Sequence, residues 1–339
     1  MIDFRYHLVS LISVFLALAV GIVLGAGPLQ GPIGSSLTSQ VDGLRADRDQ
    51  LRTELDVSRS ETQQTAALVE ATASDLVADS LTDRTIVLVR TAGADNDQAD
   101  AMSARIEEAG GRVVSDLNLT ETTFAAPDAE LVTALREADA SLPEDDGAAV
   151  TQGLARAFAT QPAADDSDDE GSASPAPEAD ATEAPEDEAD SEARDASEAL
   201  FTALSDAGRI ERGEWSEADV VVLLAPDVAP EATPDPTPSG SASPESAEDR
   251  SAAVQALAGF SAALAGQTTT VVAGPTASAS VGLLADLRSD RVDLSTVDGT
   301  DLATGPVLVP LVTQAALDGE FGDFGTAQGA TAVLPDTAQ

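Results

Sequence analysis

The stretch Asp219-Val-Val-Val-Leu-Leu-Ala225 decides the fold class, and Thr85-Ile-Val-Leu-Val89 repeats its pattern. Both are continuous apolar runs of strand length, without the alternation of polar and apolar residues that a half-exposed strand shows. Strands of this kind are buried on both faces, which is typical of parallel sheets covered by helices on either side. The two stretches therefore predict the centre of an α/β domain.

Further strands and helices are expected around these two runs. The predicted strands span residues 112–119, 268–273 and 292–297, and the helical patterns span residues 127–142, 148–158, 197–207, 251–265 and 307–317. Strands that alternate with helices indicate a mainly parallel sheet. We therefore expect residues 83–339 to form one Rossmann-like α/β domain.

Two segments interrupt this predicted domain. Residues 161–192 hold 13 acidic residues and no basic one, and residues 229–248 repeat proline among threonine, serine, glutamate and alanine. Segments of such composition bury too little apolar surface to offset the entropy lost on ordering. We predict that both are disordered inserts, one acidic and one proline-rich.

The N-terminal region carries a long uncharged segment. Its apolar part, residues 8–29, matches the roughly 20 residues that a helix needs to cross a bilayer. Arg5 lies in the preceding stretch, residues 1–7, so the positive-inside rule predicts a cytoplasmic tip and an extracytoplasmic bulk. A cleaved signal peptide is the alternative, but Leu24-Gly25-Ala26 is a poor cleavage site. We predict an uncleaved, single-pass transmembrane helix in the cell membrane.

Small residues recur at every fourth position along this helix. They form a stripe on one face, which allows two helices to approach closely in lipid, and they are Ser13, Ala17, Gly21 and Gly25. Glycine is common in membrane helices, which is the plain alternative. Taken with the segment that follows, the stripe predicts the dimer face of a membrane helix.

The next segment, residues 36–80, predicts a coiled-coil helix. Apolar residues follow one another at coiled-coil spacing and form a seam in its first half, namely Leu37, Val41, Leu44, Leu51 and Leu55. Arg48 interrupts this seam, which weakens beyond Leu55. A helix packed on its own domain is the alternative. A homodimer is the interpretation that joins the seam to the small-residue stripe.

The composition excludes several classes of chemistry. The chain has 60 acidic and 17 basic residues for a net charge of −43, no cysteine, no lysine, and His7 as its one histidine. Nucleic-acid binding is disfavoured because phosphates require basic partners. Ser-His-Asp and Cys-His catalysis, thiolate metal sites and a P-loop each lack an essential residue in the outer domain. We expect a protein that is not an enzyme and has no cofactor, metal or catalytic site, with an acid-based wall hydrolase as a minor alternative.

The opening sequence resembles that of a known family. Met1-Ile-Asp-Phe-Arg-Tyr-His-Leu-Val-Ser10, running into the apolar stretch up to Gly25, is similar to the actinobacterial copper transport protein family, the MctB-like family typified by a mycobacterial outer-membrane copper transporter. The resemblance continues through the coiled-coil stretch, residues 85–89 and residues 308–324. It implies copper export or pore formation in the envelope. A related branch resembles a cell-separation factor that controls a peptidoglycan hydrolase through its coiled coil.

Two functions follow from these observations. A pore needs a closed barrel or several membrane helices, and copper(I) prefers sulfur or imidazole ligands, which the outer domain offers only at Met102. The residues therefore favour a dimeric, non-enzymatic envelope scaffold that binds another envelope or membrane protein through its coiled coil or its α/β domain. The alternative is a component of copper efflux or of an envelope channel, with copper expected only by family analogy.

Overall fold

The computed structural model describes residues 4–26, 30–158, 186–211, 213–227, 245–290 and 292–336. The chain divides into two compact units, residues 1–65 and residues 66–339. Residues 161–185 of the acidic insert and 229–244 of the proline-rich insert lie outside the described residues. The prediction that the inserts are disordered therefore concerns a part of the chain that the structure does not describe. The last residues of both inserts are helical, however, because α6 (Glu186–Asp206) and α7 (Glu245–Ala265) begin earlier than the sequence pattern suggested.

Two long helices begin the chain. α1 runs from Phe4 to Ala26, and α2 runs from Gln30 to Val77 and crosses the boundary between the two units. α2 starts six residues before the predicted coiled coil and contains Pro32 in its first turn. Proline is tolerated there because backbone N–H groups in a first helical turn have no helical acceptor.

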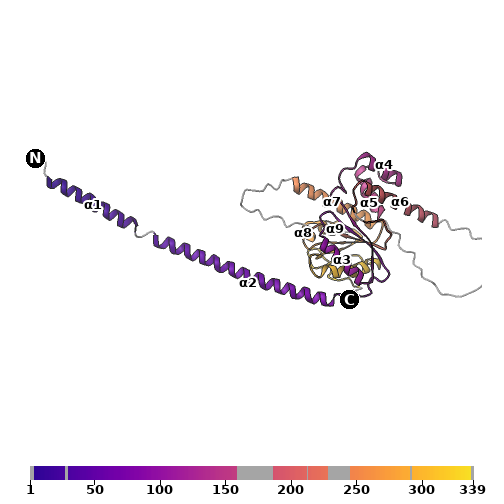
Figure 1. Ribbon diagram of the computed structural model, residues 1–339, viewed down its shortest axis with the longest axis horizontal. Coiled ribbons are helices and arrows are strands. Elements are labelled where there is room, and N and C mark those ends of the chain that lie inside the picture. Colours follow the sequence, from indigo (N-terminus) through magenta and orange to yellow (C-terminus); the bar gives the residue numbers. More distant parts are fainter. Residues whose placement is uncertain are drawn as a thin grey trace, which may run out of the picture. The chain divides into compact units, whose positions relative to one another are not determined.

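A six-stranded sheet forms the centre of the second unit (Figure 1). Its strands are β1 (Thr85–Arg90), β2 (Arg112–Asn118), β3 (Val220–Leu224), β4 (Thr270–Ala273), β5 (Ser295–Val297) and β6 (Asp323–Phe324). Each strand pairs in parallel with its neighbours. The predicted α/β class with a parallel sheet is therefore confirmed.

The strand order is β2-β1-β3-β4-β5-β6. Its first five strands follow the flavodoxin-like doubly wound order, whereas the Rossmann fold has the order 3-2-1-4-5-6. The Rossmann-like part of the prediction is therefore not confirmed. The order reverses direction between β1 and β3, and ligands of doubly wound proteins bind at such a switch point, outside the carboxyl ends of the strands.

Helices cover both faces of the sheet. One apolar core joins the sheet to α4 (Ala129–Ala138), α5 (Asp146–Ala157), α6, α7, α8 (Ser278–Val281) and α9 (Leu283–Asp290), and Figure 1 shows α4 to α7 gathered together. The other core contains α3 (Asn96–Glu108), α10 (Gly305–Leu317) and the end of α2. Val221 and Leu223 of β3 belong to the first core, and Val222 to the second. This division explains why β3 is apolar at every position.

The last turns of α2 belong to the α/β domain. Val69, Ala73 and Val77 lie at helical spacing and pack into the core that contains α3. Arg105 of α3 adds an ion pair with Glu70 of α2. The alternative of a helix packed on its own domain therefore holds for Val69–Val77.

Candidate functional sites

The small-residue stripe lies on an exposed helix. One span, Tyr6–Val23 of α1, is long and apolar enough to cross a membrane by length and composition, a test that a signal sequence also meets. Ser13, Ala17, Gly21 and Gly25 are all exposed on α1. A Cβ atom added at Gly21 or Gly25 would meet no atom within 4 Å. The hydroxyl of Ser13 donates to the Val9 carbonyl at 2.9 Å. The role of the stripe as a dimer face stays a prediction.

The predicted seam residues lie together along α2. Leu37 is part of this helix, but its side chain lies outside the described residues. The other four side chains are exposed at 38% for Val41, 68% for Leu44, 65% for Leu51 and 49% for Leu55. Their exposure leaves the seam available to another helix, and the coiled coil itself stays a prediction.

The carboxyl edge of the sheet is the place where a doubly wound fold would bind a ligand. Phosphates often bind there at a helix N-terminus, whose N–H groups attract anions. In this protein the carboxylate of Asp95 caps α3 and accepts from the N–H groups of Asp97 at 2.7 Å and Gln98 at 3.3 Å. Because Asp97 adds a second negative charge in the first turn, this edge opposes phosphate binding.

A cavity of about 720 Å³ opens beside this helix terminus. Its apolar lining comes from α3, from the loop before α10 and from the first turn of α10, with Ala101, Ala104, Leu302, Ala303 and Pro306. Six carboxylates and one guanidinium also line it, those of Glu70, Asp95, Asp97, Glu108, Asp227, Asp301 and Arg105. Within the described part of the chain, no group of three or more histidines, cysteines or acids has an arrangement that could hold a metal ion.

The buried arginine at the end of β1 is fully engaged. Arg90 donates to both carboxylate oxygens of Asp116, at 2.7 Å and 2.5 Å, and to Asn96 and Asp100 at 3.0 Å each. The hydrogen bonds with Asp116 raise the pKa of Arg90 above its ordinary value, against the effect of burial. This arginine therefore fixes the loop after β1 and the end of β2.

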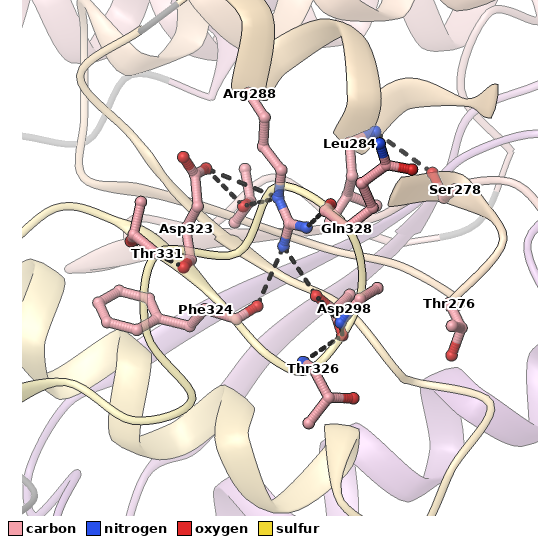
Figure 2. Close-up of polar contacts among 12 residues, drawn as sticks. Thr276, Ser278, Leu284, Arg288, Asp298, Asp323, Phe324, Thr326, Gln328 and Thr331 are labelled. Atoms are coloured by element: carbon pink, nitrogen blue, oxygen red, sulfur yellow. Dashed lines mark hydrogen bonds and ion pairs between the residues drawn. The ribbon is translucent and has the colours of Figure 1, made fainter. Parts of the chain in front are cut away.

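A second buried arginine holds the C-terminal segment (Figure 2). The side chain of Arg288 of α9 is 5% exposed, and its Nη2 atom lies 3.0 Å from Oδ2 of Asp298, whose side chain is 1% exposed. The same guanidinium donates to the carbonyls of Phe324 at 3.0 Å and Gln328 at 2.9 Å. We name Arg288, Asp298 and the backbone they bind the C-terminal clamp.

Asp298 completes the clamp from the other side. Its carboxylate accepts from the N–H groups of Thr326 at 2.9 Å and Ala327 at 3.1 Å. Gly325 has φ +126°, and a Cβ atom there would lie 2.3 Å from this carboxylate. Because every polar atom of the pair has a partner on its own chain, the clamp serves the structure of the domain. No local pattern in the sequence predicts it, because its members lie 10 to 40 positions apart along the chain.

The sequence holds few soft copper ligands, namely two methionines and one histidine. Met102 is fully buried in the core beside α3, and His7 lies on α1. Met1 lies outside the described residues. The sequence contains no cysteine. Copper(I) prefers thioether, thiolate and imidazole ligands, and among residues 66–339 the sequence offers one such side chain, that of Met102.

Comparison with known proteins places these features in a family context. The family described as "Copper transport outer membrane protein, MctB" matches residues 1–335. Proteins named copper transporter MctB from Mycobacterium bovis and Mycobacterium tuberculosis are 36% identical over 130 residues, which make up 38% of this chain and 41% of the relative. The Mycobacterium leprae protein of the same name is 32% identical over 121 residues, or 36% of this chain and 38% of that protein. The aligned part thus spans about two-fifths of the relatives' length.

Proposed function

The chain belongs to the MctB family of copper transport outer membrane proteins, and we propose that within this family it acts as a membrane-anchored, dimeric, non-enzymatic scaffold of the cell envelope. In this proposal α1 is the anchor, α2 is a coiled-coil stalk, and the α/β domain stands on the extracytoplasmic side. The scaffold binds another envelope or membrane protein. Control of a peptidoglycan hydrolase at cell separation is the specific form that we propose.

The exposed seam of α2 is the observation that carries this proposal. Burying one leucine or valine side chain contributes about 1.5–3 kcal/mol relative to leaving it in water. Much of this contribution is absent for the four described seam side chains, because each is more than one-third exposed; these are Val41, Leu44, Leu51 and Leu55. Their spacing matches that of side chains that interlock with an identical helix. A second copy of the chain would bury all four.

The anchor strengthens this association. α1 holds the stalk at a membrane, where two tethered chains meet at a much higher effective concentration than in solution. Its stripe of small residues would provide a second contact between the same two chains. Each contact is weak alone, and the two together support a dimer.

The α/β domain supports a binding role over a catalytic one. Its carboxyl edge carries Asp95 where a phosphate would lie, and Arg90 and Asp298 are engaged in ion pairs within the domain. A net charge of −43 favours encounter with partners that present a basic surface.

Copper efflux, or a channel role, is the second candidate, because the description of the family names copper transport. The burial of Met102 and the cysteine-free sequence favour the scaffold. Copper binding by the intact chain separates the two candidates.

Sedimentation of the full-length protein in detergent tests the dimer. We expect wild type to be dimeric at roughly 10–100 µM, and a variant with Leu44→Asp, Leu51→Asp and Gly21→Ile to be monomeric. The matched control carries Thr53→Asp, Ser60→Asp and Gly43→Ile, which lie on α2 outside the seam, and it should stay dimeric. A monomeric wild type would overturn the dimeric scaffold. Crosslinking in intact cells, followed by capture of the chain, would then identify the partner.

A further inference from the structure

Charged residues flank the seam of α2 in a repeating order. In the heptad register that places Leu44 and Leu51 at position d, the three successive e positions are Arg45, Arg52 and Arg59, and the three g positions are Asp47, Glu54 and Glu61. Acidic residues outnumber basic ones by 60 to 17 in the whole chain. Three arginines in a row on one edge of the seam therefore run against the general composition.

We propose that these six side chains form a charge ladder that selects a second copy of the same chain, parallel and in register. The inference rests on the proposed dimeric stalk and specifies its partner and its orientation. In a parallel pair of helices, each g residue lies beside the e residue of the next heptad in the other helix. Asp47 then faces Arg52 of the second copy, and Glu54 faces Arg59. By symmetry, each side of the seam carries two attractive pairs.

Antiparallel pairing would reverse the sign of every contact. In that arrangement, e residues face e residues and g residues face g residues across the seam. Arginines would then meet arginines, and carboxylates would meet carboxylates, which destabilises a coiled coil. The ladder therefore favours two stalks that leave one membrane in the same direction.

The isolated chain leaves the relevant arginines available. An aspartate precedes each ladder arginine by three residues, so pairs within one helix are the alternative use of these charges. The structure forms that pair for Arg45, whose Nη1 lies 3.1 Å from Asp42. Within the described residues, Arg52 and Arg59 make no ion pair. Arg45 is also the ladder arginine that would face an uncharged residue, Gln40, across the seam. The unpaired arginines are thus the two that the parallel arrangement uses.

The ladder stops where α2 joins its own domain. Val69 would take the next apolar position of the seam, but it packs into the core that contains α3. The residue at the e position after Arg59 is Ala66, which carries no charge. Charge pairs between copies are therefore confined to the part of α2 before Val69.

Single cysteines report on the pairing, because the chain contains no cysteine of its own. In the full-length protein in membranes, Leu51→Cys places one thiol at a d position. Parallel, in-register helices bring two such positions within disulfide range, with Cα atoms about 4.4–6.8 Å apart. We expect Leu51→Cys chains to link on mild oxidation. Thr53→Cys, which lies on the outer side of the same helix, should not link.

Charge changes in the Leu51→Cys background test the ladder. The acidic variant carries Arg45→Glu, Arg52→Glu and Arg59→Glu, and it should weaken stalk association by roughly 100-fold, because four attractive pairs become repulsive. The reversed variant adds Asp47→Arg, Glu54→Arg and Glu61→Arg, and it has the net charge of wild type. It should link to itself as wild type does and should not link to wild-type stalks carrying a different tag.

The outcomes separate this inference from the proposed function. Absence of linking in Leu51→Cys would overturn the parallel, in-register pairing, whereas a monomeric wild type in the sedimentation experiment would overturn the dimeric stalk itself. Equal linking of the acidic variant and wild type would overturn the ladder and leave the dimer standing. Mixed linking of reversed and wild-type chains, or failure of the reversed variant to link to itself, would also overturn the ladder. Circular dichroism of each variant confirms that α2 is still helical, so that a loss of linking reports pairing.

Discussion

Replacing Asp298 by asparagine should destabilise the α/β domain, because it removes one charge from the buried pair of the C-terminal clamp. Both side chains are at most 5% exposed, and removal of one partner from such a pair costs about 3–5 kcal/mol. Asp323 would remain near the guanidinium, with its Oδ1 atom 3.7 Å from Nε of Arg288. This second carboxylate compensates part of the loss, so we expect about 3 kcal/mol.

Urea unfolding followed by tryptophan fluorescence measures this change. Trp215 is the only tryptophan of the chain, and its Nε1 atom donates to the Ala157 carbonyl at 3.1 Å. Its emission therefore reports the α/β domain of the full-length protein. Asp146→Asn is the matched control, because Asp146 lies at the same 3.0 Å from Arg136 in a pair that is 35% and 60% exposed. An exposed pair contributes under about 1 kcal/mol.

The test is the difference in the free energy of unfolding between these two variants. If Asp298→Asn lowers the free energy of unfolding no more than Asp146→Asn does, burial does not strengthen the clamp and the reasoning fails. A double-mutant cycle with Arg288→Met adds a second check. The two clamp changes should be non-additive by more than about 1 kcal/mol, because each removes the same contact.

Three further outcomes are expected. Burial acts to raise the pKa of Asp139, but hydrogen bonds from Ser141 and Arg156 outweigh it and hold that pKa below the ordinary value of 3.8. The stability lost in Asp139→Asn should therefore be constant above pH 3.8 and should vanish as the pH falls through the lowered pKa. Urea midpoints measured across this pH range test the prediction. Gly305→Ala would place a Cβ atom 2.2 Å from the Gly299 carbonyl oxygen and should cost about 3 kcal/mol or more, whereas Gly259→Ala, with open space around it, should be neutral or stabilising in urea unfolding. The full-length protein should retain no stoichiometric copper(I) against a chelator of micromolar affinity, and retention would favour the copper-handling candidate.

The central strands were predictable from sequence, and the edge of the sheet was not. β1 and β3 are buried on both faces, so their apolar runs are unbroken and identify them directly. β6 has two residues, Asp323 and Phe324, which is too short for any periodic signal. The strand order could not be predicted from the sequence, because it depends on which helices pack on which face of the sheet rather than on any single segment.

The candidate sites divide in the same way. The seam and the stripe are local repeats, so the sequence shows them, and the structure places them on exposed helices. The C-terminal clamp joins Arg288 to residues up to 40 positions away, and only the folded chain brings them together. Val69 continues the heptad spacing, yet its partner is the core of its own domain, which periodicity alone does not reveal.

Both outer strands of the sheet bond to other segments of their own chain, which limits how the proposed partner could bind. On the β6 side, the N–H of Thr331 donates to the Asp323 carbonyl at 2.7 Å, and the N–H of Gly325 donates to the Ala332 carbonyl at 3.0 Å. On the β2 side, the N–H of Glu211 donates to the Asn118 carbonyl at 2.8 Å. These groups are the ones that a foreign strand would use to extend the sheet. Strand addition is therefore disfavoured at both edges, which protects the domain from edge-to-edge aggregation, and the proposed partner would have to be recognised by helices and loops.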